Sequence, residues 1–229
     1  MSLSKYHSIN NKHISKSCKY SCMSYYSVNN ARIKNIKYLK GKDNSSCIYI
    51  NDSHSESYIA FRGSSNIHDF KDSLTIVPHR ETLGFVHKGY YNKYVNIQEA
   101  IENVLINDVS EHIIFTGHSM GGCVALLSAL KTKDFLNKNN INKNIYCYMF
   151  GSPCVGDKDF LINANHELKT VLGIDLDTDV ISRIPLNPFF KKPKDLLVLK
   201  ESNEKNIFQI LKNHSCFTYY KEIKNYFDI

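Results

Sequence analysis

The sequence predicts a single α/β domain of 229 residues, with a mostly parallel sheet covered by helices on both faces. Short apolar runs alternate along the chain with amphipathic segments, a pattern typical of strand–helix–strand units. The 42% hydrophobic content is sufficient for one large core, and 10 Gly and 5 Pro exclude a low-complexity or collagen-like chain. No internal repeat or linker divides residues 1–229, so one domain is expected.

The expected elements follow in chain order. Residues 1–45 are rich in Ser, Lys, Asn and Tyr without a clear period, which predicts a helical or irregular N-terminal layer. The strand-like runs 47–50 and 58–61 flank a segment of turn composition and predict a hairpin. Apolar spacing, run length and flanking polar residues then predict helix 94–106, strand 113–115, helix 123–130, strand 145–150, helix 158–164, strands 170–174 and 196–199, and a C-terminal helix over 216–227.

The net charge of +7 comes almost entirely from lysine, because only four of the 29 basic residues are arginine. Arginine supplies the bidentate fork that reads bases and phosphates, whereas lysine acts as a point charge. Apart from the run 191–194 (KKPK), the lysines are scattered. We therefore expect a solvated basic surface and no specific nucleic-acid partner. Residues 1–7 contain no apolar signal-peptide core and no apolar run could span a bilayer, so a cytoplasmic location is expected.

The seven cysteines are odd in number and irregularly spaced, which favours reduced thiols over a disulfide framework. Cys18 and Cys22, with His7 and His13 upstream, have the composition of half a zinc site. Nothing downstream provides the second half of that spacing, so we expect these cysteines at the surface and no bound metal.

The most informative motif is Gly117-His118-Ser119-Met120-Gly121, which follows an apolar strand and precedes an apolar helix. This Gly-x-Ser-x-Gly pattern in that context is the nucleophile elbow, a turn so tight that its flanking positions need glycine. Only about 0.04 random matches are expected in a chain of this composition. The pattern therefore predicts Ser119 as a nucleophile exposed at the carboxyl edge of the sheet.

A serine nucleophile needs a histidine base and a carboxylate that orients the base, here expected in the order Ser, acid, His. Two histidines follow Ser119. His166 ends a short helical stretch, and its upstream acids do not follow a core strand: Asp134, Asp157 and Asp159. His214 lies in a polar connection before the last helix, where a loop would bring it over the sheet. We therefore favour His214.

The orienting acid is expected just after strand 170–174, where Asp175, Asp177 and Asp179 are candidates. We favour Asp179, because the segment after it returns directly to apolar packing. The oxyanion of an acyl-transfer intermediate also needs hydrogen-bond donors. We assign these donors to Met120, which follows the nucleophile, and to Ser64, in a loop that follows strand 58–61.

With these motifs in order, the chain resembles the class 3 (fungal-type) lipase family of α/β-hydrolases. The resemblance spans about residues 46–219 and is carried by Ala60-Phe61-Arg62-Gly63-Ser64, Val86-His87-Lys88-Gly89-Tyr90, Thr116–Gly122, Phe150-Gly151-Ser152-Pro153 with Val155-Gly156, and Asp179–Pro185. It implies an α/β-hydrolase fold and a lipase or carboxylic-ester hydrolase whose catalytic residues are Ser119, Asp179 and His214. Ser64 and Met120 match the family's oxyanion-hole positions, and His87 is given only a supporting role.

The resemblance also implies that segment 65–78 is a lid, with Ile67 and Phe70 as its apolar face; the alternative is a fixed surface loop. Because this lid is polar for a helix that seeks an interface, modest interfacial activation is expected. The implied substrates are acylglycerol or phospholipid esters, with the basic surface favouring anionic aggregates, and no cofactor is needed. The alternative is a catalytically silent lipase-like domain that binds lipid or a protein partner.

Overall fold

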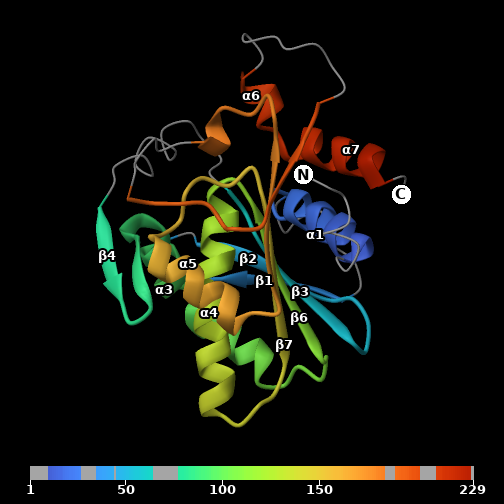
Figure 1. Ribbon diagram of the computed structural model, residues 1–229. Coiled ribbons are helices and arrows are strands. Elements are labelled where there is room, and N and C mark those ends of the chain that lie inside the picture. The colour runs from blue at the N-terminus through green and yellow to red at the C-terminus, as the bar shows by residue number, and fades with distance from the viewer. Residues whose placement is uncertain are drawn as a thin grey trace.

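The computed structural model describes residues 10–26, 35–43, 45–63, 77–183, 189–201 and 210–227 (Figure 1). Its centre is a seven-stranded sheet in the order β1-β2-β3-β6-β7-β8-β9, beside a separate β4–β5 hairpin. The sheet strands are β1 (Ile36–Lys40), β2 (Ser46–Asn51), β3 (Glu56–Phe61), β6 (His112–His118), β7 (Asn144–Phe150), β8 (Thr170–Leu176) and β9 (Leu196–Leu199), and the hairpin is β4 (Pro78–Glu81) and β5 (Gly84–His87).

The sheet is mostly parallel, as the sequence predicts. Strands β1, β2 and β3 pair antiparallel, and β3, β6, β7, β8 and β9 form one parallel run. Within that run Phe61 pairs with Gly117, and His118 pairs with Phe150. The carboxyl ends of three neighbouring strands therefore meet at one edge, where side chains from distant parts of the chain can converge.

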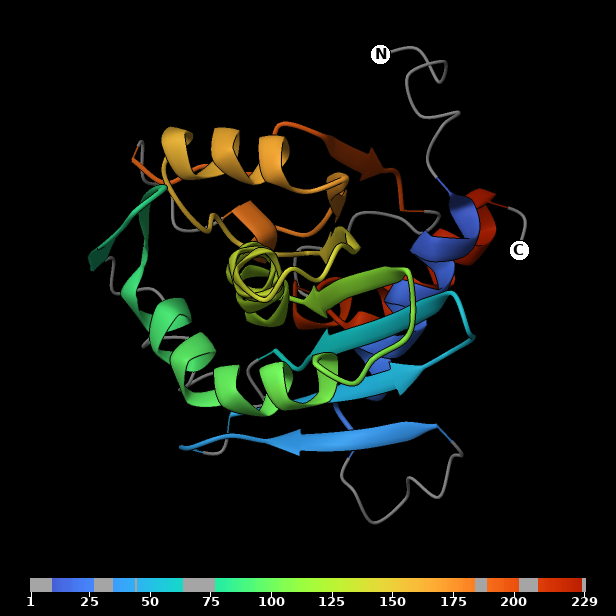
Figure 2. The ribbon, with the colours of Figure 1, turned by 90° about the horizontal axis from the view of Figure 1, so that it is seen from below.

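Helices cover both faces of this sheet (Figure 2). One face is covered by α3 (Lys88–Leu105), α4 (Met120–Lys138) and α5 (Lys158–Glu167), and the other by α1 (Asn11–Met23) and α7 (Cys216–Phe227). The helix α6 (Ile210–Asn213) and the 3₁₀ turn η3 (Ile181–Arg183) lie in the connections near the carboxyl edge (Figure 1).

Strand β3 illustrates how the sequence produces these two layers. Successive side chains of a strand point to opposite faces. Tyr58 and Ala60 accordingly pack with α1 and α7, whereas Ile59 and Phe61 pack with α3 and α4. All four are buried. Because both faces are covered, the central strands are continuous apolar runs rather than alternating ones, which explains their clear signal in the sequence.

The predicted hairpin 47–50/58–61 is confirmed as β2–β3, with Cys47 opposite Phe61. The helix predicted from residue 94 begins earlier, at Lys88, because the side chain of His87 accepts a hydrogen bond from the N–H of Gly89 and caps α3. This capping is consistent with the supporting role given to His87. The N-terminal layer contains α1 and also β1, and neither β1 nor the β4–β5 hairpin was predicted.

The cysteine prediction is wrong for one pair, since Cys22 and Cys216 form a disulfide across 194 positions. Spacing in the sequence cannot reveal this pairing, which exists because α1 and α7 pack side by side. Cys18 is 0% exposed, so the expected surface position is also wrong for this residue. The remaining five cysteines are free thiols: Cys18, Cys47, Cys123, Cys147 and Cys154.

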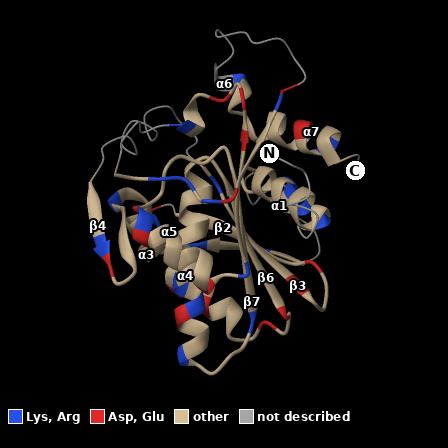
Figure 3. Cartoon of the chain, viewed as in Figure 1, with Lys and Arg blue, Asp and Glu red and all other residues tan. Residues whose placement is uncertain are grey.

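Lysine and arginine residues are spread along helices and connections and are interleaved with acidic residues (Figure 3). Among the helices described, none combines the length and the apolar character that crossing a bilayer requires.

Candidate active site

Ser119 occupies a sharp turn between β6 and α4. Its backbone has φ 56° and ψ −134°, a left-handed conformation that is uncommon for a residue other than glycine. The N–H of Ser119 donates to the carbonyl of Phe150 at 2.9 Å, which fastens the turn to the end of β7. Such local strain is typical of functional sites, where the surrounding structure enforces it.

Two glycines make this turn sterically possible. A Cβ atom on Gly117 would lie 2.3 Å from the carbonyl carbon of Gly121. A Cβ atom on Gly121 would lie 2.3 Å from the carbonyl oxygen of Phe61, at the end of the neighbouring strand. Both distances are too short for any side chain, so the glycine spacing of the motif has a direct steric cause.

The structure brings Ser119, His214 and Asp179 into one hydrogen-bonded line. His214 Nε2 lies 2.8 Å from Ser119 Oγ, and His214 Nδ1 lies 2.8 Å from Asp179 Oδ2. Because an ionised carboxylate only accepts, Nδ1–H donates to Asp179 and Nε2 is left to accept the serine proton. The geometry is that of a nucleophile, its base and the group that orients the base.

Asp179 is completely buried, yet its carboxylate has four hydrogen-bond donors. Oδ1 accepts from the N–H groups of Ile181 at 2.9 Å and Ser182 at 3.3 Å, and Oδ2 accepts from His214 and from the Tyr219 hydroxyl at 2.6 Å. Burial alone raises the pKa of a carboxylate, but the bonds from His214 and Tyr219 outweigh burial and hold the pKa of Asp179 below its ordinary value. Asp179 is therefore ionised at neutral pH.

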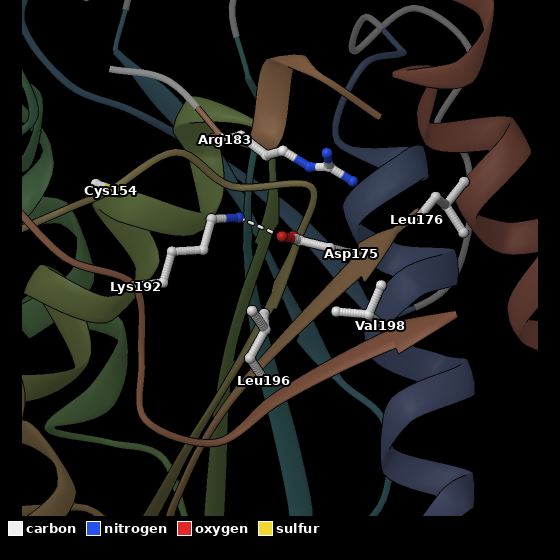
Figure 4. Close-up of a pocket in the computed structure, with 7 residues that line it drawn as sticks. All are labelled: Cys154, Asp175, Leu176, Arg183, Lys192, Leu196 and Val198. Carbon is white, nitrogen blue, oxygen red and sulfur yellow. Dashed lines mark hydrogen bonds and ion pairs between the residues drawn. The ribbon is translucent and has the colours of Figure 1, made fainter. Parts of the chain in front are cut away.

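The two competing aspartates have other partners. Asp175 is ion-paired with Lys192 and lines a pocket of about 260 Å³ (Figure 4). Burial raises the pKa of Asp175 although Lys192 lowers it. The Asp177 carboxylate accepts the N–H of Glu201 at 3.1 Å. Neither contact involves His214, which leaves Asp179 as the aspartate that the fold brings to this histidine.

The other histidine considered from the sequence, His166, lies elsewhere. Its side chain is 82% exposed and contacts only its neighbour Glu167 among the ion pairs of the described residues. Of its possible acids, Asp157 caps α5 by accepting from the N–H of Phe160. The alternative that placed the base at His166 is therefore not supported by the geometry.

Two tyrosines that the sequence did not predict also belong to the site. The Tyr219 ring is buried in α7, and its hydroxyl accepts from the N–H of Leu176 at 3.2 Å while donating to Asp179. Tyr25, just after α1, has its hydroxyl 2.8 Å from Nδ1 of His118, the residue before the nucleophile. In the sequence, Tyr219 has only the signal of an apolar position on an amphipathic helix, and Tyr25 has none.

His118 is buried against His214, with ring centroids 4.8 Å apart. Burial, together with the nearby His214 ring, lowers the pKa of His118 to about 3. The imidazole of His118 is therefore neutral at neutral pH and places no competing positive charge beside His214.

Of the two residues assigned to the oxyanion hole, Met120 is described and Ser64 lies outside the described residues. Met120 is the first residue of α4, where the backbone N–H groups and the helix dipole favour negative charge. The segment that leads to Ser64 lies against the elbow, because a Cβ atom on Gly63 would be 3.1 Å from Cβ of Ser119.

Of the expected lid, residues 65–76 also lie outside the described residues. Within the part of the chain that is described, no group of three His, Cys, Asp or Glu side chains is arranged to hold a metal ion.

Comparisons with known proteins identify the family of the chain. The family described as Lipase (class 3) matches residues 58–189. A lipase of Rhizomucor miehei is 33% identical over 157 residues, which cover 62% of this chain and 41% of that protein. The chain thus spans less than half the length of this curated relative.

Solved structures show the same fold. A triacylglyceride lipase of Rhizomucor miehei superposes with a TM-score of 0.63 and 20% identity, covering 89% of this chain and 82% of the other. A triacylglycerol lipase of Penicillium expansum gives a TM-score of 0.68 at 13% identity, covering 83% and 80%.

Proposed function

The chain belongs to the class 3 lipase family, and from this premise we propose that it is a serine hydrolase that cleaves acyl esters of lipids. The observation that carries the proposal is the continuous line from Ser119 through His214 to Asp179, with both heavy-atom distances at 2.8 Å. These two contacts support the roles of nucleophile, base and orienting acid that we propose for the three residues.

In the proposed reaction, His214 Nε2 accepts the proton of Ser119 as Oγ attacks the ester carbonyl carbon. The tetrahedral intermediate then collapses, and His214 donates this proton to the leaving alcohol. Water, deprotonated by the same nitrogen, attacks the acyl-serine and releases the carboxylic acid. Asp179 stays ionised, keeps the proton of the neutral ring on Nδ1 and stabilises the imidazolium during each transfer.

We assign the stabilisation of the negative charge that develops on the carbonyl oxygen to two hydrogen-bond donors, the N–H of Met120 and Ser64. The position of Met120 at the start of α4 supports the first donor, since the partial positive charge of the helix terminus acts there. The contact of the preceding Gly63 with the elbow supports the second.

We propose acylglycerols or phospholipids as the substrates, with activity favoured on anionic aggregates. The support for anionic aggregates is the net charge of +7, carried by lysines spread over the molecule (Figure 3). We further propose that segment 65–78 covers the site with modest interfacial activation. A large rise in rate as a soluble ester passes from monomer to micelle would contradict the modest activation.

The test is a hydrolysis screen over p-nitrophenyl esters of increasing chain length, acylglycerols, and neutral and anionic phospholipids. We expect turnover by the wild-type chain and none above background by Ser119→Ala. Ser128→Ala is the matched control, because this serine lies buried on the same helix and its hydroxyl has no hydrogen-bond partner among the described residues. This control is expected to retain wild-type activity.

A fluorophosphonate probe separates hydrolysis from a silent binding domain. We expect labelling of the wild-type chain and of Ser128→Ala, and no labelling of Ser119→Ala. A chain that hydrolyses no ester in the screen and is labelled no better than Ser119→Ala would refute the proposed activity.

A further inference from the structure

The Cys22–Cys216 disulfide joins the two helices on one face of the sheet. Cys22 lies near the end of α1, and Cys216 is the first residue of α7. The two helices lie side by side in both ribbon views (Figures 1 and 2). Both cysteines are partly exposed, whereas four of the five free cysteines are buried.

Each end of this bond is within about one helical turn of a residue that contacts the active site. Cys216 follows His214 by two residues and precedes Tyr219, which donates to Asp179, by three. Cys22 precedes Tyr25, whose hydroxyl contacts His118 beside the nucleophile, by three residues. The disulfide therefore connects the histidine segment directly to the helix that contacts the elbow.

The histidine segment is held by hydrogen bonds as well as by the disulfide: His214 contacts Ser119 and Asp179, and Tyr219 contacts Asp179. His214 lies in the turn between the four-residue helix α6 and α7, where Ser215 N–H donates to the Lys212 carbonyl at 3.0 Å. Among the described residues of α7, only three are buried: Tyr219, Glu222 and Ile223. A 12-residue helix has little intrinsic stability in water and depends on its tertiary contacts, so a covalent link at its first residue adds to the anchoring that Tyr219 provides.

We propose that the Cys22–Cys216 disulfide is a redox control of the active site. When it is oxidised, α7 holds His214 between Ser119 and Asp179. A dithiol reduces the bond: its thiolate attacks one sulfur, the other cysteine leaves as a thiol after protonation, and the second thiol of the reagent completes its own disulfide. The products are Cys22 thiol, Cys216 thiol and oxidised reagent, and the freed start of α7 no longer fixes His214.

This inference rests on the proposed hydrolase function, and its readouts are chosen to separate the two. The wild-type chain is assayed before and after treatment with dithiothreitol, with alkylation and mass measurement to count the free thiols. We expect kcat on a p-nitrophenyl ester to fall about 10- to 100-fold with little change in KM, because an error of about 1 Å in positioning a catalytic group costs that much. Reoxidation should restore the rate.

The double variant Cys22→Ser/Cys216→Ser should have the low kcat of the reduced protein and no response to dithiothreitol. The control is Cys154→Ser, which removes the one partly exposed free thiol. It should have the wild-type rate and remain sensitive to reduction. Far-UV circular dichroism should change little in each case, and amide hydrogen exchange should increase in residues 212–219 when the bond is reduced.

An unchanged kcat in protein shown to be reduced would overturn the inference, as would a double variant as active as the oxidised wild type. Unfolding of the whole chain on reduction would also overturn it, since the control is inferred to act locally. If the oxidised chain hydrolyses no ester, the proposed function fails, and hydrogen exchange then decides the inference alone: equal exchange over residues 212–219 in both redox states refutes it.

Discussion

Replacing Tyr219 by phenylalanine removes one oxygen atom from the buried core of the active site. The ring is 0% exposed, and its hydroxyl donates to Asp179 at 2.6 Å and accepts from the N–H of Leu176 at 3.2 Å. Phenylalanine fills nearly the same volume, so packing is retained while both hydrogen bonds are lost. The substitution therefore isolates the polar contribution of this side chain.

The expected cost is about 2–4 kcal/mol of unfolding free energy. A hydrogen bond to a charged group contributes about 1.5–3 kcal/mol, and a buried N–H that loses its acceptor adds about 1 kcal/mol. For a domain of this size the melting temperature should fall by about 5–15 °C. We expect kcat to fall only about tenfold, since Asp179 keeps His214 and two backbone donors.

The dependence on pH has a definite sign. The pKa of Asp179 is lowered from 3.8 in the folded protein, so its stabilising bonds are fully present above that value and are lost as pH falls through the lower folded-state value. The stability difference between the wild type and Tyr219→Phe should therefore be largest near pH 7 and should shrink as the pH falls below 3.8.

The assay is urea denaturation followed by far-UV circular dichroism, since the chain has no tryptophan to report by fluorescence. The matched control is Tyr220→Phe, a half-buried neighbour on the same helix, which should stay within about 0.5 kcal/mol of the wild type. The reasoning is refuted if Tyr219→Phe is as stable as Tyr220→Phe at pH 7. It is also refuted if the stability difference between the wild type and Tyr219→Phe does not shrink as the pH falls below 3.8.

Three further predictions concern the acid, the elbow and the buried imidazole. Asp179→Asn should lower kcat by about 10⁴-fold, whereas Asp177→Asn should retain most of the activity in the ester assay. The reverse result would assign the role of orienting acid to Asp177. Gly122→Ala places a Cβ atom 1.9 Å from the Ser152 hydroxyl oxygen, so urea denaturation should show the free energy of unfolding lowered by about 1–3 kcal/mol. Adding Ser152→Ala should restore part of this stability, and a double variant no more stable than Gly122→Ala would contradict the steric cause. The pKa of His118 is lowered from 6.5 in the unfolded chain to about 3 in the folded protein, so between these pH values the unfolded chain binds one more proton at this residue. The free energy of unfolding of the wild type should therefore fall by about 3 kcal/mol from pH 7 to pH 4 through His118. An equally steep fall in a His118→Phe variant would contradict this contribution.

The strands and the elbow were predictable because their causes are local. Apolar run length identified the central strands, and the steric demand of the turn identified Ser119 between Gly117 and Gly121. Strand β1 and the β4–β5 hairpin gave no comparable signal. Their strands are short and only partly buried, with charged and polar residues among the apolar ones, so no run stands out.

The acid and the base were predictable only as a choice among alternatives. Chain order left six aspartates and two histidines open, and the structure brings Asp179 and His214 together while pairing Asp175 with Lys192. The catalytic roles of these residues stay predictions until the variants are assayed. The cytoplasmic location predicted from the sequence also stays a prediction, and compartment fractionation would test it.

The sequence by itself determined the mostly parallel sheet and the position of the candidate nucleophile, since these depend on apolar runs and on one tight turn. The family followed from motifs that occur in order along most of the chain. Only the tertiary structure decided which acid meets the base, that Tyr25 and Tyr219 belong to the site, and that Cys22 pairs with Cys216. Those contacts join residues 35 to 194 positions apart. They arise when α1 and α7 pack on the same face of the sheet, and no local pattern of residues records that packing.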